Sequence, residues 1–172
     1  MDAVNPSARA RYLCLDEETG FGCAEATFAA LQEHFELSNA GNSTEAMALN
    51  GGIAYSGGTC GALTGAALSL GRLAGTRQSD RPQAKRVARY LLQKLMADFA
   101  AEHGSTQCRT LTGFDLVSDH DAFLASGIWE GGCQAQIEFV VDRMAPLTDR
   151  KAWEAALAGL TAEETAALLE AE

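Results

Sequence analysis

Small residues recur at every fourth position in one stretch of the chain, and this pattern constrains the fold more than any other feature. The residues that share the spacing are Gly57, Gly61, Gly65 and Ser69. A four-residue repeat places them on one side of a helix, which is therefore nearly bare backbone. Glycine within a helix costs about 0.5–1 kcal/mol relative to alanine. We therefore expect a close neighbour on this side, either another helix or a cofactor.

Helical periodicity also dominates the rest of the chain, and no alternation typical of strands competes with it. The longest predicted helix begins after Asp80 and ends at His103–Gly104, and Thr161 and Glu164 form a capping box that predicts another helix near the C-terminus. We predict an all-α fold: a compact, single-domain helical bundle of about six to eight helices, with short C-terminal helices appended.

The charge balance and the longest uncharged stretch exclude two classes of partner. The net charge is -10, with 23 acidic against 13 basic residues, which is the wrong sign for a nucleic-acid-binding protein. Residues 46–71 carry no charge, but they are rich in glycine, serine and threonine, so we expect no membrane insertion. The N-terminus lacks the apolar core of a signal peptide. These features predict a cytoplasmic protein in a reducing compartment.

Four of the five cysteines fall in or just before the first turn of a predicted helix: Cys23, Cys60, Cys108 and Cys133. The free amides and the dipole at a helix N-terminus favour thiolate over thiol, which predicts lowered pKa values. The chain has no CxxC motif, so a shared site would have to be assembled by the fold. Taken from the residues alone, inert buried thiols remain an equal alternative.

The segment from Cys60 to Gly65 reads CGALTG and resembles the CGAxxG signature of the C-GCAxxG-C-C family of redox-active proteins. The surrounding order is similar: Ala-Glu-Ala follows Cys23, Arg109 follows Cys108, and Cys133 comes last. The resemblance implies a helical domain with a redox or metal role. A similar domain accompanies the split-Soret cytochromes, where an iron–sulfur centre is associated with the cysteines. This chain has no haem motif, so the similarity to these cytochromes implies an iron–sulfur cluster and no haem.

The resemblance divides the chain into three parts: an N-terminal segment (1–20), a four-cysteine helical redox domain (21–145) and a C-terminal helical extension (146–172). Cys14 lies outside the shared pattern. We interpret it as a half-buried helix residue or as a resolving thiol for Cys23. We expect Tyr55 and Trp129 to be core aromatics near the cysteine turns, and His120 to be a surface residue.

The leading hypothesis is a redox protein in which Cys23, Cys60, Cys108 and Cys133 hold a [2Fe–2S] cluster or another metal centre for electron transfer or redox sensing. Around it, Gly57, Gly58 and Gly61 would bring backbone amides to the sulfurs, and Arg109 would stabilise an anionic centre or form a structural salt bridge. The partner would be an unidentified redox protein. A homodimer is also predicted.

Two alternatives remain open at this point. The first is a metal-free thiol–disulfide switch with no cofactor, most naturally between Cys60 and one partner. Cys60 and Cys108 are the candidate redox thiols, and the three pairings that four cysteines allow stay open. The second is a helical interaction module, in which the cysteines are structural and the acidic C-terminal helix recognises a partner. The residues do not indicate whether the protein is an enzyme.

Overall fold

The described fold is built from helices of unequal length. The computed structural model describes residues 5–158 and 160, and within them it contains helices and no strand, which confirms the all-α prediction. The α-helices are α1 (Pro6–Leu15), α2 (Cys23–His34), α3 (Gly61–Arg77), α4 (Arg81–His103), α5 (Cys108–Thr112), α6 (His120–Ala125), α7 (Gln134–Met144) and α8 (Arg150–Leu157). Three shorter turns are η1 (Thr44–Leu49), the π-helical η2 (Trp129–Cys133) and η3 (Ala145–Thr148).

The longest helix begins and ends where its capping residues predict. The Asp80 carboxylate accepts a hydrogen bond from the Gln83 amide at 3.0 Å, and Gly104 ends α4 in the left-handed conformation. Helix α3 begins directly after Cys60, which occupies its N-cap. The predicted capping box at Thr161 and Glu164 lies outside the described residues.

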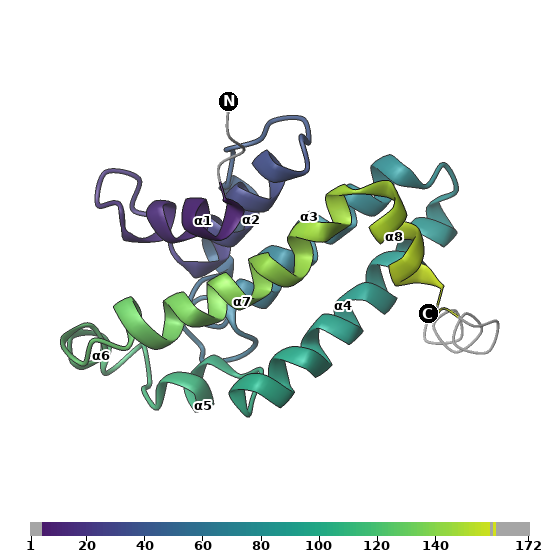
Figure 1. Cartoon of the computed structure of the whole chain (residues 1–172). Coiled ribbons are helices and arrows are strands. Elements are labelled where there is room, and N and C mark those ends of the chain that lie inside the picture. The colour runs from purple at the N-terminus through teal and green to yellow at the C-terminus, as the bar shows by residue number, and fades with distance from the viewer. Residues whose placement is uncertain (1–4, 159, 161–172) are drawn as a thin grey trace.

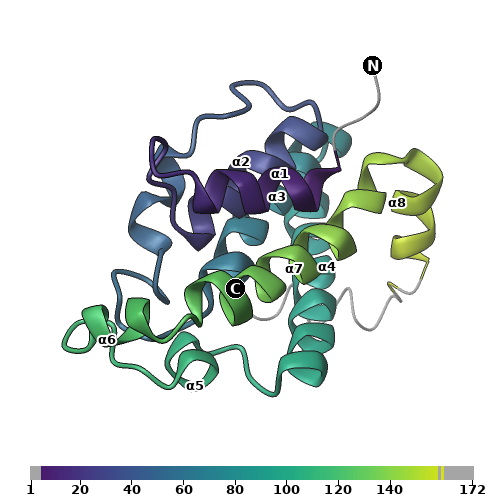
Figure 2. The same cartoon turned by 60° about the vertical axis from the view of Figure 1, so that its left-hand side comes forward.

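The core lies between five of the helices. Helix α3 packs on α2 and on α4, while α1 packs on α2 and α7. In both views α7 runs through the middle of the molecule, with α8 at one of its ends and α5 and α6 at the other (Figures 1 and 2). No helix in the described part of the chain is long and apolar enough to cross a membrane.

The bare side of α3 receives the neighbouring helix α2. A Cβ atom on Gly65 would lie 2.4 Å from the carbonyl oxygen of Ala24, and one on Gly61 would lie 2.2 Å from the sulfur of Cys23. The close neighbour predicted from the four-residue repeat is therefore a helix backbone together with a thiol. The small residues allow α2 and α3 to approach so closely that Cys23 touches the start of α3.

A short extended pairing holds the segment before α3 against the segment before α5. Thr59 and Gln107 form an isolated antiparallel bridge. On either side of it, the Cys60 amide donates to the Thr106 carbonyl at 2.8 Å, and the Cys108 amide donates to the Gly58 carbonyl at 2.7 Å. This pairing brings two distant cysteines side by side.

Candidate functional site

A cavity of about 820 Å³ lies where the ends of several helices meet, and four cysteines line it: Cys14, Cys23, Cys108 and Cys133. Much of the remaining wall is aromatic or aliphatic and includes Tyr55, Leu116, Phe123, Leu124 and Trp129. Tyr55 and Trp129 lie near the cysteines as predicted, but Tyr55 is 46% exposed and is therefore not the core residue that was expected. The wall is mainly apolar, so a group bound here would have surroundings less polar than bulk water.

Cys60 lies behind this wall. Its side chain is 5% exposed, and its thiol is 3.7 Å from the Oε1 atom of Gln136, to which it donates a hydrogen bond. Burial raises the pKa of Cys60 well above its usual value, and the nearby sulfurs of Cys23, Cys108 and Cys133 raise it further. The fold thus gathers all four predicted site cysteines, three around the cavity and the fourth next to them.

Cys23 is the centre of the group. It is partly exposed, and its sulfur accepts hydrogen bonds from the backbone amides of Gly51, Ala24 and Gly61. Electrostatic interactions with Cys23 contribute to the pKa values of all four other cysteines. Asn50 holds this end of α2 in place: its Oδ1 accepts from the Ala24 amide at 2.9 Å, and its Nδ2 donates to Glu25 at 2.8 Å.

The loop that presents the Gly51 amide has an unusual backbone. Five consecutive residues, Gly51 to Tyr55, have positive φ angles between 50° and 75°. Three of them are not glycine, and each such residue costs about 1–2 kcal/mol in this conformation. Backbone strain of this kind concentrates at functional sites. Here it lies beside Cys23, and both ends of the run line the cavity.

The predicted lowering of the thiol pKa values was wrong for the metal-free chain. Cys23 and Cys108 do begin helices, and Cys60 and Cys133 occupy N-caps. Burial outweighs the effect of the helix ends: it raises the pKa of Cys108 to about 11 and the pKa of Cys133 to about 12, and it also raises that of Cys23. The thiols of the metal-free chain are therefore protonated at neutral pH.

This protonation predicts slow alkylation of the folded, metal-free chain. The unfolded chain has ordinary thiol pKa values, whereas those of Cys14 and Cys133 are about 12 when folded. The thiolate fraction changes tenfold per pH unit below the pKa, so at pH 8 we expect both residues to react with iodoacetamide at least 100-fold more slowly than in urea. Because the folded pKa values are raised, their contribution to stability is complete below the ordinary thiol pKa and is lost as the pH rises toward 12. Equal labelling rates would contradict this account.

The other predicted site residues take mainly structural positions. Arg109 forms an ion pair with Asp115 at 2.9 Å and does not line the cavity. Gly57 lies under Arg109, where a Cβ would be 2.8 Å from the Cβ of that residue, and Gly58 lies against the backbone of Gly52. Among the three glycines, Gly61 is the one whose amide reaches a cysteine sulfur.

A metal site needs donor atoms of suitable chemistry around one space. Within residues 5–158 and 160, no three His, Cys, Asp or Glu side chains are arranged to hold a single metal ion. A single Zn²⁺ needs all its sulfur ligands about 2.3 Å from one point. The cysteines instead surround a space, and soft thiolate donors are those that iron–sulfur clusters use. In the chemistry of their donor atoms, the residues are therefore compatible with a cluster and do not form a site for a single ion.

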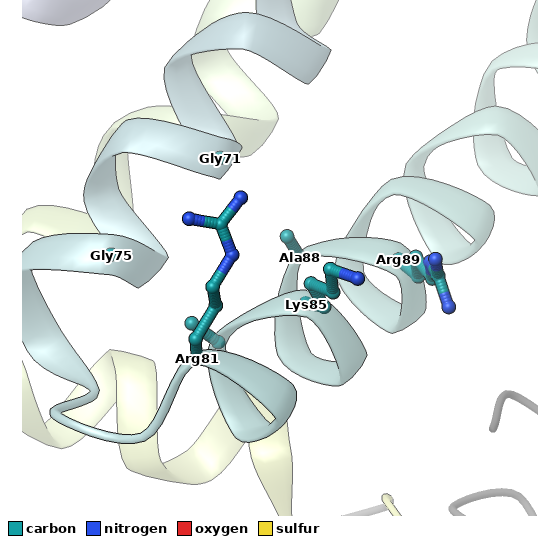
Figure 3. A pocket seen from close by; sticks show the side chains of 7 residues that line it. Gly71, Gly75, Arg81, Lys85, Ala88 and Arg89 are labelled. Atoms are coloured by element: carbon teal, nitrogen blue, oxygen red, sulfur yellow. The ribbon is translucent and has the colours of Figure 1, made fainter.

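A second hollow lies between α3 and α4, away from the cysteines. Three basic residues of α4 line it: Arg81, Lys85 and Arg89. Arg81 reaches toward Gly71 on α3, whereas Lys85 and Arg89 lie further along α4 and do not converge with it (Figure 3). This arrangement does not form a focused binding site for an anion, and the cysteine-lined cavity remains the candidate site.

Sequence reasoning missed three features of the site. Cys14 is 5% exposed and faces the cavity, although it was interpreted as half-buried. His120 is exposed, as predicted, but it also lines the same cavity and stacks edge-on against Tyr55 with ring centres 5.6 Å apart. Asn50 had no sequence signal, because its role depends on a loop folding back on α2. For Cys14, the position between Leu13 and Leu15 at the end of a predicted helix was the available signal.

Fold and site together define a helical protein with a buried, multi-cysteine site. The chain belongs to the family described as "Putative redox-active protein (C_GCAxxG_C_C)", whose model matches residues 21–146. The family match confirms the resemblance seen in the sequence and includes the four cysteines of the motif, while Cys14 lies outside it. No curated protein and no solved structure shows significant similarity to the chain.

Proposed function

We propose that Cys23, Cys60, Cys108 and Cys133 hold an iron–sulfur centre beside the cavity, through which the protein transfers electrons or senses the redox state. The family is redox-active in its description. The observation that carries the proposal is the convergence of four cysteines that are distant in sequence: three line one mainly apolar cavity, and Cys60 lies next to them. Inert core thiols have no need to converge in this way.

A bound centre of this kind would supply one-electron chemistry. The contribution of the chain begins with the four thiols, which must lose their protons to act as ligands, so their raised pKa values make binding favoured by higher pH. The amides of Gly51, Ala24 and Gly61 donate to the Cys23 sulfur and stabilise its negative charge. Hydrogen bonds to ligand sulfurs raise the reduction potential of a centre, and this loop would therefore tune it.

The surface around the cavity suits a redox partner protein. Leu15, Tyr55 and Leu124 line the cavity and are also exposed to solvent. Acidic side chains stand among them, including Glu17 and Glu130. An apolar centre with an acidic rim favours a partner with a basic docking face. We propose such a partner, in the cytoplasm; the homodimer stays a prediction.

A second candidate function, the metal-free thiol–disulfide switch, is favoured by a specific observation. The cavity holds Cys14 as well as the family cysteines, and in the metal-free chain these thiols are protonated and close enough to influence one another. Closely spaced thiols can form disulfides after attack on an oxidant. This function and the metal-bound one can belong to the same protein in different states.

The experiment that tests the proposal is anaerobic reconstitution with iron and sulfide, applied to single serine variants. We expect Cys23→Ser, Cys60→Ser, Cys108→Ser and Cys133→Ser each to bind less than a quarter of the wild-type iron. Cys14→Ser is the matched control, because it removes a thiol of the same cavity that lies outside the proposed ligand set, and it should keep wild-type iron. Wild-type iron content in the Cys60 variant would show that the ligand assignment is wrong.

A further inference from the structure

The fifth thiol of the chain belongs to the same cavity as the family cysteines. Cys14 lies one residue before the end of α1 and is almost completely buried. It lines the cavity together with Cys23, Cys108 and Cys133. A structural core position would not require a thiol that faces a cavity already lined by three others.

Cys23 is the partner that the fold places best for Cys14. The two residues stand near the ends of α1 and α2, which pack against each other and are joined by residues 16–22. Among the cysteines, Cys23 is the one whose electrostatic interaction with Cys14 is strongest. The turn between them contains Gly20, which has a φ of 61° and open space around it, so this segment can adjust without a clash.

The surroundings of the two sulfurs suit them for different steps. Cys23 is partly exposed and receives three backbone amide hydrogen bonds from neighbouring residues, which stabilise a thiolate. Cys14 is more deeply buried, and the side-chain amide of Gln134 donates to its sulfur. An oxidant that enters the cavity would therefore meet Cys23 first.

We propose that Cys14 is the resolving thiol of this site and forms a disulfide with Cys23 when a low-molecular-weight disulfide oxidises the protein. The Cys23 thiolate attacks one sulfur of the oxidant, the S–S bond breaks, and one small thiol leaves with the proton from Cys23. The Cys14 thiolate then attacks the Cys23 sulfur and expels the second small thiol, which takes the proton from Cys14. The protein loses two electrons, and the oxidant gains them.

This disulfide goes beyond the proposed function and does not depend on a bound metal. It would occupy one of the four proposed ligands, so the oxidised chain could not hold the centre in full. The site would then have two exclusive states: one with four thiolates available for a centre, and one locked by the Cys14–Cys23 bond. Oxidation and metal loading would thus oppose each other.

The sequence offers a direct way to map this bond. Cleavage after glutamate cuts at Glu17, Glu25, Glu45, Glu102, Glu130 and Glu138, among other sites, so each of the five cysteines falls in a different peptide. The full chain, with and without prior metal chelation, is treated without oxygen with oxidised glutathione. The remaining thiols are alkylated in urea, because Cys14 reacts slowly in the folded chain, and the digest is analysed by mass spectrometry before and after reduction.

We expect a disulfide between the peptide 1–17 and the peptide 19–25 as the main product in the chelated sample. In Cys14→Ser the resolving step is lost, so glutathione should remain attached to Cys23, and the mixed disulfide should rise at least tenfold over wild type. Cys108→Ser is the matched control and should still form the Cys14–Cys23 bond.

The proposal is overturned if Cys14 stays alkylatable in both samples, or if its bond goes to a cysteine other than Cys23. Iron content measured on the same preparations separates this test from that of the metal centre. An iron-free protein that forms the bond would leave the resolving role intact and remove the centre, whereas an iron-loaded protein without the bond after chelation would do the reverse. Circular dichroism of Cys14→Ser confirms that the variant is folded.

Discussion

Gly61→Ala is expected to abolish iron binding and to lower the free energy of unfolding by about 1–3 kcal/mol. The new methyl group would lie 2.2 Å from the Cys23 sulfur and 3.1 Å from the Ala24 amide, so either the thiol or the start of α2 must move. The same shift removes the hydrogen bond that the Gly61 amide donates to the sulfur. Iron content after reconstitution and urea unfolding measure the two effects.

The control lies on the same helix. Gly71 has open space where its Cβ would be, so Gly71→Ala should raise the free energy of unfolding by about 0.5–1 kcal/mol through helix propensity alone. Its iron content should match wild type. If the two variants behaved alike, the close contact between α2 and α3 would not be what positions Cys23.

Gly52→Ala should be even more destabilising, by about 2–5 kcal/mol. Gly52 combines a φ of 75° with a close contact, since its Cβ would lie 2.5 Å from the Gly58 amide nitrogen. The carbonyl oxygen of Gly58 would lie 2.6 Å away, and because these contacts are with backbone atoms, no side chain can move aside. We expect loss of the pairing between residues 57–60 and 106–109, and a lower melting temperature together with faster alkylation of Cys60 and Cys108.

Gly104→Ala separates the effect of the left-handed backbone from the effect of the close contact. Gly104 has a similar φ of 81°, but nothing lies within 4 Å of its would-be Cβ. The free energy of unfolding of this variant should fall by only about 1–2 kcal/mol, the cost of a left-handed alanine. The reactivity of Cys60 and Cys108 should be unchanged. A Gly52 variant no worse than the Gly104 variant would mean that the strained loop does not support the cysteine turns.

The local sequence predicted the helices well because their signals are local. The Asp80 cap, the Gly104 stop and the apolar stripe of α4 all act within a few residues, and the four-residue repeat in α3 indicated a close neighbour. The family signature then identified four cysteines whose convergence the structure supports. These features depend on spacing along the chain, which a sequence displays directly.

The features that the sequence did not predict depend on contacts between distant segments. The bridge of Thr59 with Gln107 has no strand alternation to reveal it, because it is a single pair. The raised thiol pKa values depend on burial by other helices, which outweighs the helix ends. Cys14 belongs to the cavity because α1 packs on α2 and α7. None of these relations is encoded in a local pattern.

The most direct test of a cysteine-held redox centre is the iron and acid-labile sulfide content of the full chain purified without oxygen, together with its visible spectrum. We expect two irons and two sulfides per chain for a [2Fe–2S] cluster, with visible absorption that bleaches on reduction by dithionite. A colourless protein that also failed to take up iron and sulfide on reconstitution would contradict the central claim and leave the thiol–disulfide switch as the function of this cavity.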